Sequence, residues 1–164
     1  LCGLVLAACA GLPERSPVAR TPRSLSAFAI DGRVAVRRGD SRHYAHIAWR
    51  HEEVRDEILL TTPLGQGVAE LSRDAAGARL LTSDRREYVA PDLGTLATRV
   101  FGVSLPLDGL PAWLSGVAPD PATGWRIDYL DYQSDAADAL PTLIELKRED
   151  IELRLKIDDW SLAR

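Results

Sequence analysis

Apolar and polar residues alternate along most of the chain, with the period of two that is typical of β-strands with one buried face. Residues 151–158 show this without interruption, because Ile and Leu occupy every second position between charged residues. Turn-forming pairs such as Gly39-Asp40 and Asp84-Arg85 separate consecutive segments of this kind. We therefore predict nine strands, at residues 28–37, 43–50, 54–62, 67–73, 78–83, 86–90, 125–133, 142–148 and 151–158.

Two segments between the sixth and seventh of these strands space their apolar residues as a helix does. The first follows the capping residue Asp92 and is stopped by Gly102. The second is short; it follows Asp108 and is stopped by Gly116, with Pro111 in its first turn. Their apolar stripes are Leu93, Leu96, Ala97, Val100 and Phe101 in the first helix, and Leu110, Trp113 and Leu114 in the second.

These elements predict a mainly β fold with two or three helices. One face of an alternating sheet is apolar and must be covered, and a strongly curved sheet can enclose that face while helices cover the opening. We therefore expect an incomplete antiparallel β-barrel (a half-barrel) with a helical lid over a hydrophobic cavity. The alternation alone leaves open whether the interior is solidly packed or partly hollow.

The amino terminus carries an apolar run from Leu1 to Leu12, too short to span a bilayer, which takes roughly 20 residues, but suited to a secretory signal. Neither Met nor a basic segment begins the chain, so we expect a few further residues to precede Leu1. Within the run, Leu6-Ala7-Ala8-Cys9 resembles the lipobox of bacterial lipoproteins, in which the peptide is cut before a cysteine that becomes acylated. The alternative is an ordinary apolar leader that happens to contain cysteines.

We therefore expect a signal peptide with a truncated start at residues 1–8, a lipidated Cys9 with a flexible tether at residues 9–26, and a folded domain at residues 27–164. The tether contains prolines with Arg and Ser between them and no hydrophobic period. The residue after Cys9 is Ala10 rather than Asp, which resembles the lipoproteins that are sorted to the outer membrane. Removal of the signal would leave the domain without a disulfide, since Cys2 and Cys9 are the two cysteines.

Other chemistry finds little support in the sequence. The net charge is −4 and no basic face is present that would suit nucleic acid. The odd spacings from His43 to His46 and from His46 to His51 put neighbouring histidines on opposite faces of a strand, which argues against a metal site. No serine lies in a GxSxG turn, and the carboxylates alternate with apolar residues as on a solvated face. We therefore expect neither an enzyme nor a cofactor.

Several segments, taken in order and with their spacing, resemble the LolB family of outer-membrane lipoprotein receptors. The most diagnostic is LLTTPLGQGVAEL at residues 59–71. The resemblance covers roughly residues 26–160 and includes residues 28–36, 45–49, 102–107, 113–116, 125–132, 140–141 and 155–160.

The resemblance implies a receptor that accepts acylated lipoproteins from the soluble periplasmic carrier LolA and inserts them into the inner leaflet of the outer membrane. The partners would be LolA, acylated lipoproteins and outer-membrane lipid, and we expect a monomer that faces the periplasm of a Gram-negative bacterium. Such receptors carry a leucine on a projecting loop that delivers cargo into the membrane. In this chain the loop would be Pro63-Leu64-Gly65, with Leu64 in that role.

A receptor for acyl chains needs a concavity lined by interchangeable apolar groups. The inward positions of the predicted strands provide candidates, although each of them could equally be an ordinary core residue. They are Val34, Val36, Ile47, Trp49, Ile58, Leu60, Trp125, Ile127, Tyr129, Ile144, Leu146, Leu153 and Leu155. The candidate lid residues are Leu96, Val100, Phe101, Trp113 and Leu114.

Alternatives remain at this point. Leu64 is unusual in a turn, where polar residues are expected, but it could fold back onto the sheet. The chain could be a structural or partner-binding envelope lipoprotein with a solid β core, or an acyl hydrolase that acts on lipid. A soluble carrier of the LolA type would share the architecture but would have no use for an acylated Cys9.

Overall fold

The computed structural model describes residues 19–101 and 109–162. The predicted signal peptide, Cys9 and most of the tether lie outside these residues. The described part contains the strands β1 (Ala27–Arg38), β2 (Ser41–Glu52), β3 (Arg55–Thr61), β4 (Gly67–Asp74), β5 (Gly77–Thr82), β6 (Glu87–Ala90), β7 (Arg126–Tyr132), β8 (Pro141–Arg148) and β9 (Ile151–Leu162).

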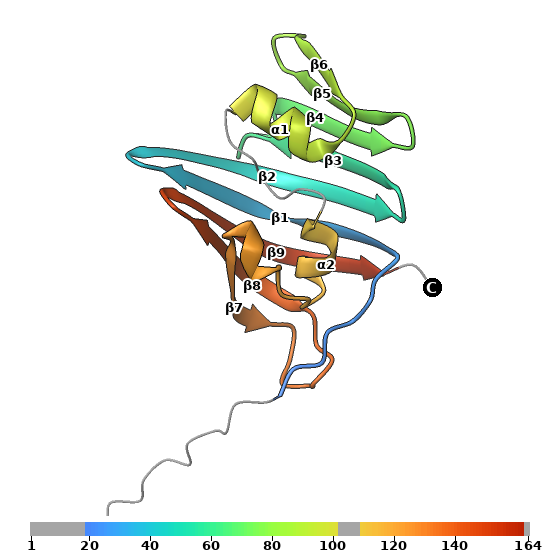
Figure 1. Ribbon diagram of the computed structural model, residues 1–164, viewed down its shortest axis with the longest axis vertical. Coiled ribbons are helices and arrows are strands. Elements are labelled where there is room, and N and C mark those ends of the chain that lie inside the picture. Colours follow the sequence, from blue (N-terminus) through green and yellow to red (C-terminus); the bar gives the residue numbers. More distant parts are fainter. Residues whose placement is uncertain (1–18, 102–108, 163–164) are drawn as a thin grey trace, which may run out of the picture.

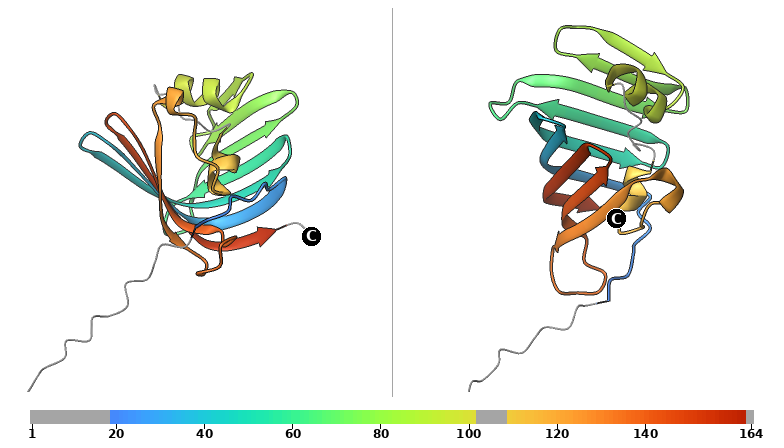
Figure 2. Two further views of the ribbon diagram at one scale, coloured as in Figure 1. Left: turned by 60° about the horizontal axis from the view of Figure 1, so that its bottom comes forward. Right: turned by 60° about the vertical axis from the view of Figure 1, so that its left-hand side comes forward.

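All nine strands form one antiparallel sheet in the order β6-β5-β4-β3-β2-β1-β9-β8-β7 (Figure 1). The last three strands return along the free side of β1, so β1 lies between β2 and β9. The sheet does not close, because β6 and β7 form its two edges, and it curves strongly around the helices (Figure 2). The predicted mainly β half-barrel is thus confirmed.

The strand predictions agree with the structure to within one or two residues, except at the end of β9, which continues to Leu162. The reason is a β-bulge. Asp31 of β1 pairs with Asp159 whereas Gly32 pairs with Ile157, so Asp158 is an extra residue in β9. The bulge shifts the alternation by one position, which is why the period-two pattern stops there in the sequence.

The first predicted helix is α1 (Leu93–Phe101), whose N-terminus is capped by Asp92 through a hydrogen bond from the Thr95 N–H to Asp92 Oδ1 at 2.6 Å. The second is α2 (Leu110–Leu114), and its N-cap is Gly109, without a side-chain cap. Asp108, which the sequence suggested as the cap of this helix, lies outside the described residues. Gly116 follows α2 with φ +95°, as expected for the residue that stops a helix.

Among residues 19–101 and 109–162, a 3₁₀ turn, η1 (Pro121–Thr123), is the third helical element. The helical pattern did not locate it, because three residues are too short for an apolar stripe.

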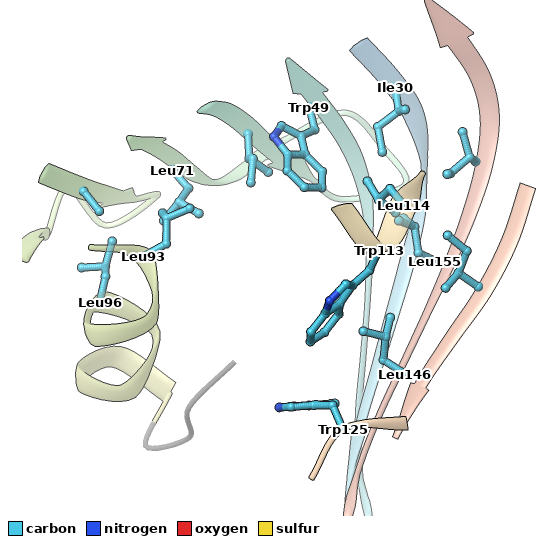
Figure 3. Close-up of a cluster of buried hydrophobic side chains, with 14 of the residues drawn as sticks. Ile30, Trp49, Leu71, Leu93, Leu96, Trp113, Leu114, Trp125, Leu146 and Leu155 are labelled. Carbon is cyan, nitrogen blue, oxygen red and sulfur yellow. The ribbon is translucent and has the colours of Figure 1, made fainter. Parts of the chain in front are cut away.

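Both α-helices lie on the concave side of the sheet (Figure 2). Helix α1 contacts β5 and β6, and its Leu93 and Leu96 are buried near Leu71 of β4 (Figure 3). Helix α2 buries Trp113 and Leu114 against the other half of the sheet. These contacts make one hydrophobic core between the curved sheet and its two helices.

The segment that leads into β1 lies against the folded domain. The Thr21 N–H donates to the Ala137 carbonyl at 2.9 Å, and the Arg23 N–H donates to the Ser115 carbonyl at 3.0 Å. The Arg20 guanidinium stacks on the Tyr132 ring, 3.9 Å from its centroid. The described end of the predicted tether thus follows the β7–β8 connection and the end of α2 before the sheet begins.

Candidate functional site

The predicted cavity residues of the strands all share the concave face of the sheet. Directly paired residues on antiparallel strands point to the same side, and the pairs here include Val36 with Leu153 and Ile47 with Leu60. The same rule joins the remaining strand residues through the pairs Val34–Leu155, Trp49–Ile58, Ile144–Leu155, Leu146–Leu153, Ile127–Leu146 and Tyr129–Ile144.

Burial divides these residues into two groups. One group is buried in the core, as ordinary core residues would be, and consists of Trp49, Ile58, Trp125, Ile144, Leu146 and Leu155. The other is half-buried and consists of Val34, Val36, Ile47, Leu60, Ile127, Tyr129 and Leu153. We call this second group the open concave patch. It leaves apolar side chains partly accessible on the inner side of the sheet.

The predicted lid residues occupy the two helices that face this side. Leu96, Trp113 and Leu114 are buried, and Val100 is half-buried against the core. The side chain of Phe101 lies outside the described residues. Figure 3 shows Trp113 and Leu114 of α2 on the concave side near Leu146 and Leu155, opposite the α1 side chains.

Helix α2 is tied to the sheet by one polar contact. The Tyr129 hydroxyl donates to the Trp113 carbonyl at 2.6 Å. Burial raises the pKa of Tyr129 to about 12, and the neighbouring Tyr132 adds to this increase. The phenol is therefore neutral at physiological pH and available as a donor to α2.

A buried polar cluster was missed by the sequence analysis. Asp56, only 1% exposed, accepts hydrogen bonds from Trp49 Nε1 at 2.8 Å and Arg73 Nε at 2.6 Å, and His51 Nδ1 lies 2.8 Å from the same carboxylate. The cluster links β2, β3 and β4 on their concave side. A signal was present, because Asp56 has the same parity as the inward-facing Ile58.

The three histidines do not converge. His46 pairs with Arg33 on the convex face, His43 is exposed, and His51 is buried against Asp56. Within residues 19–101 and 109–162, no group of three or more His, Cys, Asp or Glu side chains is placed to hold a metal ion. The histidine spacing therefore reflects strand geometry.

The β3–β4 turn presents Leu64 to solvent. The Gly65 N–H donates to the Thr62 carbonyl at 2.9 Å, which closes a tight turn with Pro63 at its second position. Gly65 adopts a φ of +81°, which glycine accommodates without strain. Leu64 is 89% exposed, so it projects from the turn and does not fold back onto the sheet.

Comparison with known proteins identifies the family of this chain over nearly its whole length. The family model described as outer membrane lipoprotein LolB matches residues 26–123 and 118–160. The chain belongs to the LolB family. The LolB-family protein of Azoarcus sp. (strain BH72), an outer-membrane lipoprotein, is 34% identical over 99% of this chain and 92% of its own length.

Two further LolB-family proteins show similar agreement. That of Nitrosomonas europaea is 33% identical over 96% of this chain and 88% of its own length. That of Thiobacillus denitrificans is 34% identical over 90% of this chain and 87% of its own length.

Membership in the LolB family confirms the resemblance and places the chain at the outer membrane of a Gram-negative bacterium as a lipid-anchored protein. Among the described residues, no helix has the length and apolar character needed to cross a membrane.

Proposed function

We propose that the chain is a receptor that accepts acylated lipoproteins from the carrier LolA and inserts them into the inner leaflet of the outer membrane. In this proposal the concave side of the sheet receives the acyl chains, the Leu64 loop contacts the lipid surface, and acylated Cys9 anchors the receptor. The chain acts by binding and transfer, and it catalyses no covalent step.

The physical problem is the cost of exposing acyl chains to water. Transfer of a sixteen-carbon chain from an apolar site into water costs on the order of 12 kcal/mol, at about 0.8 kcal/mol per methylene. A lipoprotein with up to three such chains cannot cross an aqueous space unaided. A protein that passes it on must therefore offer an apolar surface at every stage of the transfer.

The open concave patch supports the first step. Its side chains are apolar and accessible on the inner face of the sheet, and their contacts with an acyl chain would be non-directional. Such a surface would accept different acyl chains without selecting one. Displacement of α2, which covers part of this face, would expose more of it.

The Leu64 loop supports the second step. A leucine at 89% exposure buries little of its apolar surface within the folded domain. Its burial in lipid is worth roughly 1.5–3 kcal/mol. The turn that holds it is closed by backbone hydrogen bonds, so the side chain would enter the membrane without refolding of the loop.

Acylation of Cys9 would complete the arrangement. Two or more acyl chains on one residue give stable membrane attachment, whereas one chain gives only marginal attachment. Labelling with radioactive palmitate is expected for the wild type and not for Cys9→Ala. Equal labelling of both would remove Cys9 as the attachment site.

Transfer of a labelled lipoprotein from LolA to this chain tests the proposal directly. We expect label to move from the carrier to the chain when the two are mixed, and then to liposomes when these are added. Retention of all label on the carrier would refute the receptor assignment.

The separate role of the loop is tested by Leu64→Glu. This variant should fold and accept cargo but should fail to insert it into liposomes. Val89→Glu is the matched control, because Val89 is also an exposed apolar residue but lies on β6. Normal insertion by Leu64→Glu would end the assignment of the loop.

The alternative is a structural or partner-binding envelope lipoprotein with a solid β core. The buried group of predicted cavity residues favours this alternative, since these side chains already pack within the hydrophobic core. Binding of an acylated peptide or a hydrophobic dye to the Cys9→Ala chain distinguishes the two. Saturable binding supports the receptor, and its absence supports the alternative.

A further inference from the structure

The convex face of the sheet carries a pocket that the acyl-transfer proposal does not use. It has a volume of about 220 Å³, and its lining includes Arg33, His46, Arg154, Lys156, Tyr44 and Pro63. None of its lining residues is acidic. Val34, Ala35 and Ala45 complete the lining, so the pocket combines several basic side chains with an aromatic ring and small apolar residues.

The strand register places this pocket on the side opposite the open concave patch. Arg33 pairs with His46 on β2 and with Lys156 on β9, and these residues alternate with inward-facing Val34 and Leu155. The basic side chains thus come from three adjacent strands and converge on the convex face.

Two of the cations are held in place by carboxylates outside the pocket lining. Arg33 donates to both oxygens of Asp158, at 3.0 and 2.7 Å, and Arg154 donates to Glu145 at 2.7 Å. Both arginine side chains remain about half exposed, and a guanidinium has five N–H donors, more than these contacts use. They can therefore donate to a further anion.

Lys156 differs from the two arginines of the pocket. It forms no ion pair with a residue in the described ranges. The Arg33 hydrogen bond holds the pKa of Asp158 below its usual range, with smaller contributions from the charges of Arg33, Lys156 and His46. The carboxylate thus stays ionised beside the pocket, and an anionic ligand would be attracted mainly by Lys156 and the outer donors of the arginines.

The pocket adjoins the Leu64 loop. Pro63, the residue before Leu64, forms part of its lining, and Tyr44 of the lining is 66% exposed. Figure 2 (right) shows the β3–β4 turn and the β1–β2 turn on the same side of the molecule. An apolar tip next to an exposed tyrosine and a group of cations has the composition of surfaces that sit at the membrane interface.

We propose that this basic pocket binds the phosphate of an anionic phospholipid headgroup while the adjacent Leu64 enters the acyl region. The inference rests on the proposed membrane contact of the Leu64 loop. Headgroup binding would fix the orientation of the domain on the membrane, with the convex strands β1, β2 and β9 next to the lipid. Charge complementarity selects an anionic lipid over a zwitterionic one.

The test is co-sedimentation of the full chain carrying Cys9→Ala with vesicles of phosphatidylcholine alone or mixed with phosphatidylglycerol. Each cation near an anionic surface raises the binding constant about fivefold. The double variant Arg33→Gln/Lys156→Gln should therefore lower the binding constant for the mixed vesicles by roughly tenfold or more. Arg79→Gln/Arg126→Gln is the matched control, since it removes two convex-face charges from distant strands β5 and β7. Circular dichroism checks that all variants fold.

The outcomes separate the pocket from the loop. Leu64→Glu should weaken binding to both kinds of vesicle, whereas the pocket variant should weaken only the preference for phosphatidylglycerol. If the pocket variant retains that preference, or if the control loses it equally, the headgroup site is refuted. If Leu64→Glu binds both vesicles normally, the loop assignment fails instead. Inorganic phosphate that binds the pocket as tightly as the vesicles do would identify a free-phosphate site and overturn the lipid assignment.

Discussion

The indole N–H of Trp49 donates a hydrogen bond to the carboxylate of Asp56 across the β2–β3 pair, at 2.8 Å, within the core. The same carboxylate contacts His51 and accepts from Arg73. A single buried carboxylate on β3 thus contacts polar groups of both neighbouring strands, β2 and β4, on the concave side of the sheet.

Asp56→Ala should strongly destabilise the domain. It leaves the Arg73 guanidinium and the Trp49 N–H without their buried acceptor, and such a loss typically costs about 3–5 kcal/mol. Urea denaturation measures the free energy of unfolding. Glu57→Ala is the control, because Glu57 is exposed on the opposite face of the same strand and should change stability by about 0.5 kcal/mol or less. Equal effects of the two variants would show that the cluster is not stabilising.

Gly32→Ala should destabilise the sheet where β1 meets β9. A Cβ at this position would lie 2.2 Å from the Lys156 carbonyl oxygen, so the two strands would have to separate. Overpacking of this kind costs about 1–3 kcal/mol. A Cβ at Gly67 meets no atom within 4 Å, so Gly67→Ala should be tolerated. Thermal unfolding compares the two, and an unchanged melting temperature for Gly32→Ala would contradict the close approach.

Tyr129 should make stability depend on alkaline pH. Its pKa in the folded protein is raised to about 12 from an ordinary value of 10.0, so folding favours the neutral phenol. The stability that it contributes is complete below about pH 10 and is lost as the pH rises to about 12. Over this range the melting temperature of the wild type should fall more steeply than that of Tyr129→Phe.

The control for Tyr129 is Tyr44→Phe, because Tyr44 is largely exposed. Its melting temperature should follow that of the wild type through the same pH range. A wild-type curve parallel to that of Tyr129→Phe would mean that the phenol does not titrate abnormally.

Ile47 and Ala48 offer a paired test of the two faces. Ile47 belongs to the open concave patch, and its neighbour Ala48 is exposed on the convex face. Loss of one apolar side chain of this size, worth roughly 1.5–3 kcal/mol, should lower the affinity for an acylated peptide by about tenfold or more in Ile47→Gln. Ala48→Gln should bind as the wild type does. Comparable affinity in both variants would move the acyl site away from the concave face.

Much of the local structure could be predicted from the sequence. The alternation located all nine strands. Within each strand it also assigned the apolar residues, among them Ile47, Ile58 and Leu153, to the inner face before any pairing was known. Asp92 and the apolar stripe after it located α1. These features depend on neighbours within a few residues, which the sequence displays directly.

The tertiary structure decided what depends on residues far apart in the chain. The alternation places Ile47 and Ile58 on the same face, yet Ile47 is half-buried and Ile58 is buried, since the concave face is not covered evenly. The bulge at Asp158 and the basic pocket exist only because β9 pairs with β1 across more than a hundred residues. The alternation of side chains along a strand is a local property of the backbone. The burial of a side chain, and the meeting of side chains from different strands, depend on which strands become neighbours, and a single sequence does not display that pairing.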